Sequence, residues 1–194
     1  MYKVALINVP FASLKFPSLA LTQLKSVLDS KLSFRVSVEL LYLNHDFAHY
    51  MGTELYQYIA VDMEAPYNGL GDWFFRQAAF PELADNTEIY FQRYFPHRNE
   101  QNQILKRLIQ EKREGLDQVL EGLIDQYKLN EADLVGFTSM FSQNVACFAL
   151  ARKIKERSPH IVIVMGGANC ETPMGQEIVK NVEHIDFVFS GTAL

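Results

Sequence analysis

Small and polar residues follow five strand-like segments of the chain, and these residues have the types that bind a ligand. They occupy residues 8–11, 44–46, 138–144, 166–169 and 190–192. In an open parallel sheet the carboxyl ends of the strands meet at one edge, and ligands bind in the crevice beyond that edge. We therefore expect the five groups to converge on a single crevice.

The fourth group begins with Gly166-Gly167, followed by the small Ala168. Two glycines at a strand end remove the Cβ atoms that would keep a ligand away from the backbone. A structural turn between strand and helix is the alternative interpretation. We expect Ser139, after the third strand, to face the same gap as the glycine pair.

The third group is rich in hydrogen-bonding side chains, namely Ser139, Ser142, Gln143 and Asn144. These side chains lie where the next helix is expected to begin. Ser142 or Asn144 either caps that helix or contacts the ligand, and the sequence leaves both alternatives open.

Several kinds of chemistry lack their motifs. Residues 8–13 contain no glycine, so the dinucleotide fingerprint G-x-G-x-x-G is missing after the first strand, and no phosphate-binding P-loop is found. No nucleophile elbow G-x-S-x-G is present either. An enzyme using an unrecognised site in the same crevice is therefore an interpretation without a named acid, base or nucleophile.

The histidines and cysteines do not form a metal-binding pattern. His45 and His49 are four residues apart on a predicted helix, but no third ligand is evident, and we expect them to be partly exposed. Cys147 and Cys170 are too few thiolates for an iron–sulfur cluster, and we expect both to be small buried residues.

The elements that position these residues alternate between strand and helix at both ends of the chain. Residues 2–9 and 34–43 have strand patterns around a helical pattern at 18–28. The last third predicts strands at 133–138, 161–165 and 186–189, with helices at 144–157 and 173–182. We predict an α/β fold with a doubly wound, five-stranded parallel sheet, Rossmann-like or flavodoxin-like, in the order 2-1-3-4-5.

The segment of about 45–130 is too long for a loop between strand and helix, so we predict a helical insert within a single domain. We expect one helix at 45–60, a turn at 66–71 and one long amphipathic helix at 100–127, with weak points at Gly115 and Gly122. Trp73, between two aromatic neighbours, is either core of this insert or a lid over a flat ligand.

Composition excludes some partners. The 194 residues carry a net charge of −5, which is unfavourable for a nucleic-acid surface, and no apolar run is long enough to span a membrane. The N-terminus lacks the pattern of a signal peptide, so we expect a cytoplasmic protein that binds neither nucleic acid nor membrane.

Several of these segments resemble one known family. DLVGFTS at residues 133–139, VMGGA at 164–168 and the opening PSLAL at 17–21 are similar to the cobalamin (B12)-binding domain of B12-dependent radical-SAM enzymes. LNHDFA at 43–48, LGDWFF at 70–75 and GGANCETPMG at 166–175 are similar to the radical-SAM C-methyltransferases that mature ribosomal peptides. The resemblance extends over nearly the whole chain, the insert included.

The resemblance implies a Rossmann-like domain that binds cobalamin, with the nucleotide tail in the crevice. The loop after the first strand lacks the D-x-H-x-x-G signature, so base-off cobalamin without a protein histidine on cobalt is expected. The residues implied to contact the cofactor are Asn8, Pro10, Phe11, Ser18, Thr138, Ser139, Met140, Phe141, Gln143, Gly166, Gly167, Ala168, Asn169, Ser190, Gly191 and Thr192.

The resemblance also implies that cofactor binding and catalysis belong to different domains. The C-x-x-x-C-x-x-C motif for a 4Fe-4S cluster is absent from these residues, so the cluster, S-adenosylmethionine and catalysis would belong to a C-terminal radical-SAM domain. This chain would hold methylcobalamin for transfer of a methyl group to a substrate carbon, expected to be in a peptide. One departure is Thr192-Ala193-Leu194, where the family has acidic residues. The alternative is a ligand-free flavodoxin-like domain that docks another protein through an exposed apolar patch on residues 46–100.

Overall fold

The computed structural model describes residues 1–62 and 64–191, and it contains a five-stranded sheet in which all paired strands are parallel. The strands are β1 (Tyr2–Asn8), β2 (Val36–Leu41), β3 (Leu134–Thr138), β4 (Val162–Gly166) and β5 (Phe187–Val188), in the order β2-β1-β3-β4-β5. The predicted fold class and strand order are confirmed. The prediction for Thr192 lies outside the described residues.

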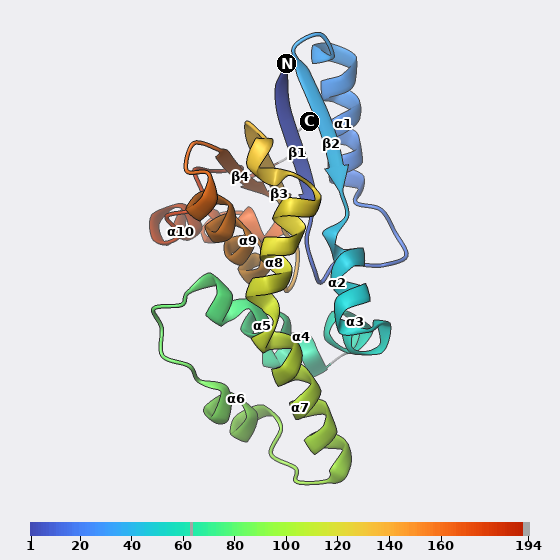
Figure 1. Cartoon of the computed structure of the whole chain (residues 1–194), viewed down its shortest axis with the longest axis vertical. Helices are drawn as coiled ribbons and strands as arrows, with labels where there is room; N and C mark the ends of the chain where they lie inside the picture. Colours follow the sequence, from blue (N-terminus) through green and yellow to red (C-terminus); the bar gives the residue numbers. More distant parts are fainter. Residues whose placement is uncertain (63, 192–194) are drawn as a thin grey trace.

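One face of the sheet is covered by α1 (Leu19–Leu32) on its β1 and β2 side (Figure 1). Ser18 begins this helix, and its side chain accepts a hydrogen bond from the Leu21 backbone N–H. Leu21 packs with Val4, Leu6 and Val38 in a small apolar cluster. Because side chains alternate along a strand, Asn8 shares this face with Val4 and Leu6.

The opposite face carries the main core. Its strand residues include Val135, Phe137, Ile163 and Met165, which are at most 3% exposed. The helices α9 (Asn144–Arg157) and α10 (Met174–Asn181) supply residues to the same core. The burial of β4 alternates along the strand, because only this face is covered by helices.

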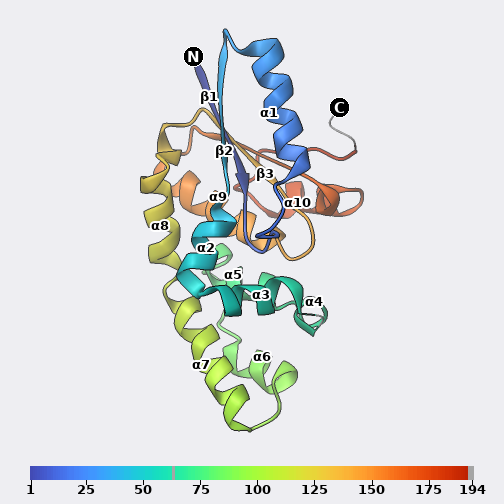
Figure 2. The same cartoon turned by 90° about the vertical axis from the view of Figure 1, so that its right-hand side faces the viewer.

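The helical insert between β2 and β3 is confirmed, and it lies beyond the carboxyl ends of the strands (Figures 1 and 2). It shares one apolar core with the sheet. Its helices are α2 (Leu43–Met51), α3 (Thr53–Val61), α4 (Glu64–Asn68), α5 (Leu70–Ala79), α6 (Thr87–Tyr94), α7 (Glu100–Glu114) and α8 (Leu116–Gln126). Two short 3-10 helices, η1 (Leu129–Glu131) and η2 (Ala168–Cys170), complete the regular elements.

Three details of the insert differ from the prediction, and each difference occurs at a glycine. The helix expected at 45–60 is two helices, separated by Gly52 with φ of +85°. The turn expected at 66–71 is instead the end of α4 and the start of α5, with Gly69 at φ of +66° between them. Both backbone conformations favour glycine and end a helix.

The long helix expected at 100–127 breaks into α7 and α8 at Gly115, the first of the two predicted weak points. The Tyr50 hydroxyl occupies the space beside Gly115 and donates a hydrogen bond of 2.7 Å to the Lys112 carbonyl. A side chain at position 115 would collide with that hydroxyl. Gly122, the other weak point, lies within α8 and does not interrupt it.

Candidate functional site

The carboxyl ends of β1, β3 and β4 lie side by side. Asn8 is opposite Thr138, and Thr138 is opposite Gly166, in the register of the paired strands. These three predicted site residues therefore form a row across the sheet at its carboxyl edge.

All three belong to the face that α1 covers only in part. Opposed residues of parallel strands share a face, so Gly136, Val164 and Phe187 lie on the same side as Leu6. We call the α1-side face of β3, β4 and β5 the open half of the sheet. It consists of Leu134, Gly136, Thr138, Val162, Val164, Gly166 and Phe187, with Phe189 just beyond the end of β5.

Exposure increases across the open half of the sheet. Leu134, Val162 and Val164 are half-buried, whereas Phe187 and Phe189 are 57% and 60% exposed. On the opposite face the neighbouring Met165 is fully buried. The described helices thus leave an apolar strip of sheet in solvent, directly beside α1.

Asn8 lies where this strip meets the edge of α1. It is only 3% exposed, yet among the described residues no protein group forms a hydrogen bond with its side-chain amide. Its polar atoms are not fully enclosed, so they can still form hydrogen bonds with water or with a ligand. Its neighbour across the sheet, Thr138, is half-buried and adds a hydroxyl.

The two glycines after β4 have different roles. Gly167 has φ of +106°, and a Cβ there would lie 2.5 Å from the Ser139 carbonyl oxygen. The close approach at Gly167 is therefore made by the chain itself, as the structural-turn interpretation requires. A Cβ at Gly166 would have its nearest contact 3.8 Å away, at the Phe189 carbonyl, so only Gly166 leaves room for a ligand.

Ser139 and Asn169 hold the β3–α9 loop against the β4 end. The Ser139 hydroxyl donates to Asn144 Oδ1 (2.7 Å) and accepts from Asn169 Nδ2 (3.0 Å). The Asn169 amide also donates to the Phe141 carbonyl (2.7 Å). Ser139 is fully buried. These groups build the loop, and only the half-buried Asn169 retains surface for a ligand.

Gln143 also stabilises the β3–α9 loop through hydrogen bonds. Its amide donates to the Val9 carbonyl (2.8 Å), and its Oε1 accepts from the Met140 backbone N–H (2.9 Å). It also precedes α9, and its side chain does not cap that helix. Neither Ser142 nor Asn144 caps the helix, so the capping alternative is wrong.

The loop presents an aromatic ring to solvent. Phe141 is 83% exposed and has φ of +50°, which is uncommon for a bulky residue. Met140 beside it is 46% exposed. A backbone held in this conformation by the hydrogen bonds of Asn169 and Gln143 is typical of a binding loop.

Pro10 and Phe11 lie on the other side of the strand ends, under the insert. Both are buried, and the Phe11 ring lies 5.2 Å from Tyr56 and 6.1 Å from both Phe74 and Phe75. The insert thus occupies that half of the expected crevice, and Phe11 supports the site from behind instead of lining its surface.

The remaining predicted residues lie at the margin. Ser18 is half-buried at the start of α1, and Ala168 is exposed in η2. Ser190 Oγ and the Gly191 N–H both donate to the Glu171 carboxylate, each at 2.9 Å. Glu171 therefore ties the segment after β5 to the segment after β4.

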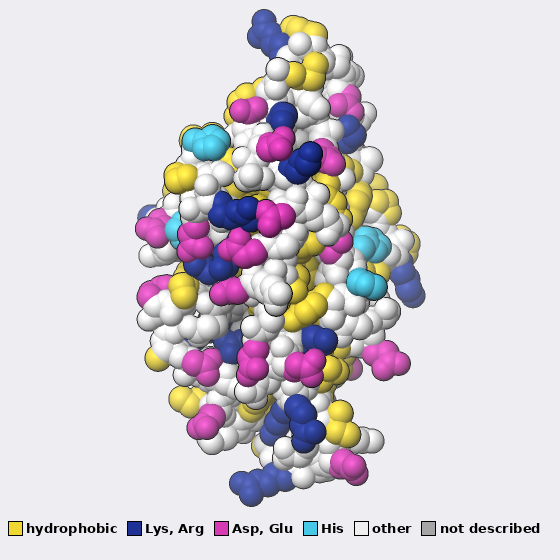
Figure 3. Space-filling model, viewed as in Figure 1, with side chains coloured by type: hydrophobic (Ala, Val, Ile, Leu, Met, Phe, Trp, Pro, Cys, Tyr) yellow, Lys and Arg dark blue, Asp and Glu magenta, His cyan; other side chains and the backbone are white. Residues whose placement is uncertain are grey.

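The residues after β2 do not join this site. The Asn44 amide donates to the Ser13 carbonyl (3.1 Å), and Asp46 accepts from the Tyr127 hydroxyl (2.9 Å). Asp46, His45 and His49 line a different cavity of about 720 Å³ between α2 and α8, where Figure 3 shows a strip of hydrophobic side chains. Among the described residues, no three metal-ligating side chains come together.

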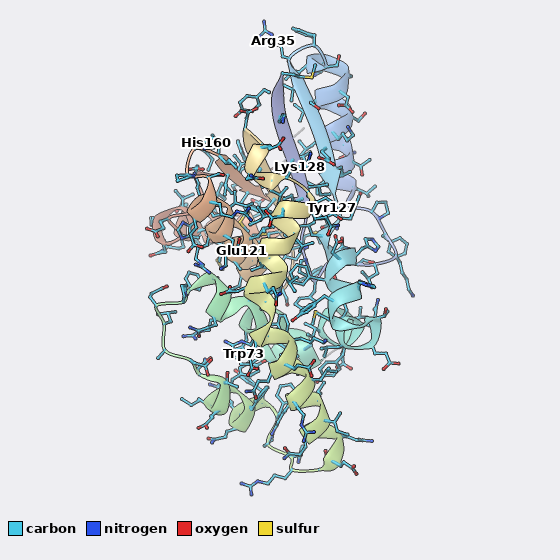
Figure 4. The ribbon with its side chains drawn as sticks, viewed as in Figure 1. Arg35, Trp73, Glu121, Tyr127, Lys128 and His160 are labelled. Carbon is cyan, nitrogen blue, oxygen red and sulfur yellow. The ribbon has the colours of Figure 1, made fainter. Side chains whose placement is uncertain are left out.

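Trp73 belongs to the apolar core of the insert, which was one of the two interpretations of the sequence. The other interpretation, a lid over a flat ligand, is wrong. Its ring is 6% exposed and stacks on Tyr90 at 4.0 Å, and its Nε1 donates to Asn86 Oδ1 (2.9 Å). Figure 4 places it between α5, α6 and α7, away from the strand ends.

Both cysteines are buried and free, as predicted. Burial raises the pKa of the Cys147 thiol well above its usual value, and burial together with the Glu171 charge raises the pKa of Cys170 to about 11. Neither thiol is thus a thiolate at neutral pH, which leaves both unsuited to nucleophilic chemistry.

Sequence reasoning missed the floor of the open half of the sheet. Gly136, Val164, Phe187 and Phe189 were not predicted as site residues, although a glycine inside a strand often marks a close backbone approach. The candidate site is an open surface, because Phe187 and Phe189 at its edge are more than half exposed.

Comparison with known proteins gave no match to a family model, to a curated protein or to a solved structure. The fold and the site therefore have to be interpreted from the chain itself. Within the described residues, none of the helices is both long and apolar enough to traverse a bilayer.

Proposed function

We propose that this chain is a cobalamin-binding module that holds the cofactor on the open half of the sheet. The observation that carries the proposal is the uncovered apolar strip beside α1, where the Asn8 amide forms no hydrogen bond with any described residue. An α/β sheet of this order binds its ligands at the carboxyl ends of the strands, where this strip ends.

The residues present fit the two ends of such a cofactor. A flat nucleotide base requires an apolar surface with few protruding side chains, and the half-buried Val164 and Gly166 could provide one. The amide and phosphate groups of the cofactor require hydrogen-bonding partners, which Asn8, Thr138 and Asn169 could provide.

The rim suits the corrin ring. Phe141 and Met140 are exposed apolar side chains on a loop held by hydrogen bonds, and Phe189 flanks them across the β4 end. No histidine occurs in residues 9–18, so the proposal keeps cobalt free of a ligand from the loop after β1.

Bound methylcobalamin would supply a transferable methyl group. In the proposal this chain binds and orients the cofactor and has no catalytic residue of its own. S-adenosylmethionine, the 4Fe-4S cluster and a peptide substrate would be held by a partner radical-SAM domain, as the sequence resemblance implies.

Spectrophotometric titration with hydroxocobalamin tests the proposal. The unmodified chain should bind saturably and shift the corrinoid spectrum. Gly166→Leu should weaken binding by at least about tenfold, because its side chain would project onto the open half of the sheet. Gly122→Leu is the matched control, since a side chain there meets open space on α8.

No spectral change up to high corrinoid concentration would contradict the proposal, and so would equal affinities of the two leucine variants. The interaction-domain alternative expects an exposed apolar patch on residues 46–100, where the exposed large apolar residues are Val61, Tyr67, Leu83, Ile89 and Tyr94.

A further inference from the structure

Helices of the insert border a half-open cavity of about 640 Å³, remote from the strand ends. Its lining comes from α5, α6, α7 and the start of α8, and includes Gln77, Glu88, Arg113 and Glu114. Trp73, labelled in Figure 4, lies in the middle of these elements. The volume falls within the range of small-molecule sites.

Arg113 is the basic residue on the lining of this cavity, and its hydrogen bonding is incomplete. The side chain is 9% exposed, and Nη1 donates to Asp85 Oδ1 (3.0 Å) and Thr87 Oγ1 (2.9 Å). Nε and Nη2 are buried and have no partner among the described residues. These two nitrogens form one edge of the guanidinium, which is the geometry that binds a carboxylate in a bidentate manner.

The guanidinium is fixed in its plane. Its Cζ lies 4.2 Å from the centre of the Trp73 ring, and the Tyr90 ring stacks on Trp73 at 4.0 Å. Two groups so close to one ring centre must lie on opposite faces, so Trp73 is held between them. Such a stack presents the free edge of Arg113 in a constant orientation.

Gln77 lines the same cavity and has a hydrogen-bond acceptor without a partner, whereas Arg113 has donors without partners. Its Nε2 donates to the Pro81 carbonyl (3.3 Å) and the Leu83 carbonyl (3.0 Å), which fixes the amide. Its Oε1 is buried and has no partner among the described residues. The cavity thus offers unused donors on Arg113 and an unused acceptor on Gln77.

Acidic side chains on the lining decide what charge a ligand can carry. Asp117 is paired with Lys153 (3.3 Å) and Glu114 accepts from Gln110 (2.9 Å), but within the described part of the chain Glu88 has no ion pair. A simple anion drawn to Arg113 would be repelled by these carboxylates. A ligand that also carries a positive group would be favoured.

We propose that this cavity binds a small zwitterion, from a free amino acid to a tripeptide in size. Its carboxylate pairs with Nε and Nη2 of Arg113, and its ammonium group faces Gln77 Oε1 and the carboxylates of Glu88 and Glu114. The site is separate from the corrinoid surface, and the inference does not depend on cobalamin binding.

Fluorescence titration tests the site directly, because Trp73 is the single tryptophan of the chain and stacks on Arg113. The probes are tri-alanine, its C-terminal amide and its N-acetyl derivative. Tri-alanine should change the emission of Trp73 saturably. The amide lacks the carboxylate and the acetyl derivative lacks the ammonium group, so each should bind at least about tenfold more weakly.

Arg113→Lys keeps the charge but removes the two-nitrogen edge, and it should lower the affinity for tri-alanine by at least about tenfold. Arg76→Lys is the matched control: Arg76 donates to the Ala84 carbonyl and does not line the cavity, so its replacement should leave the affinity unchanged. Melting curves establish that both variants fold.

Equal binding of the three peptides by the unmodified chain would overturn the inference. No saturable change in emission or in melting temperature up to roughly 10 mM tri-alanine would overturn it as well. Because these two measurements use the unmodified chain, they decide the question even where Arg113→Lys does not fold.

Discussion

Gly166 and Gly167 are adjacent in sequence but face different constraints. Gly167 is required by its own backbone, with φ of +106° and the Ser139 carbonyl 2.5 Å from the position of a Cβ. Gly167→Ala should therefore lower the free energy of unfolding by about 3 kcal/mol. Gly166→Ala meets no atom closer than 3.8 Å and should change it by less than about 1 kcal/mol. Urea denaturation compares the two, and similar losses would refute the assignment.

Asp72 links stability to pH. Burial raises the pKa of its carboxyl group, although the Val145 backbone N–H donates a hydrogen bond to it (3.2 Å). The folded chain thus binds this proton more tightly than the unfolded chain, so the contribution of Asp72 to stability falls as pH rises through its folded pKa. Asp72→Asn should gain stability relative to the unmodified chain as pH increases.

The measurement is urea denaturation of both proteins from about pH 4 to about pH 8. The difference in the free energy of unfolding should be smallest at the acidic end and should favour the asparagine variant at the neutral end. A difference that stays constant over this range would show that Asp72 titrates normally in the folded chain.

At the residue scale, the sequence predicts which side chains can form hydrogen bonds. It does not predict whether they bind a ligand or another part of the chain. Thr138, Gly166 and Asn8 were predicted at one site from their positions after strands, and the structure aligns them. Ser139 and Gln143 have the same residue types as ligand contacts, yet they hold the loop together. Which polar group is already satisfied by the chain depends on contacts between distant segments.

At the scale of elements, Arg152 joins the insert to the sheet domain. It lies on α9 and is 8% exposed. Its Nε donates to the Ala78 carbonyl of α5 (2.7 Å), and its Nη1 pairs with Glu156. Arg152→Met would leave the Ala78 carbonyl without its donor in a buried place, and should cost about 3 kcal/mol of stability.

Arg157→Met on the same helix is the control. Arg157 is more exposed and pairs with Glu121 and Asp125 at the surface, where such pairs contribute less than about 1 kcal/mol. Thermal or chemical denaturation measures both variants. Equal losses would mean that Arg152 does not hold α5 against α9.

The errors in the predicted helices have a common physical cause. Apolar periodicity continues across Gly52 and Gly115, so the pattern alone predicts one helix where the structure has two. The space beside Gly115 is filled by the hydroxyl of Tyr50, which is 65 positions earlier in the chain. A local pattern contains no information on that contact.

At the scale of the whole molecule, the sheet was predictable because each strand is a short apolar run between helical patterns, and because parallel connections follow a fixed hand. The position of the insert relative to the sheet was not predictable. It is held beyond the strand ends by contacts such as the Tyr56 hydroxyl on the Ala12 carbonyl (2.7 Å) and the Asn44 amide on the Ser13 carbonyl (3.1 Å). These contacts close one half of the expected crevice and leave the open half of the sheet uncovered.

Hydrogen exchange of the chain with and without hydroxocobalamin tests this account most directly, because it reports where the cofactor binds. The account predicts slower exchange in residues 138–143, 166–169 and 187–191, with no change in the cavity between α2 and α8. Unchanged exchange in those three segments at saturating cofactor, or protection confined to the insert, would contradict it.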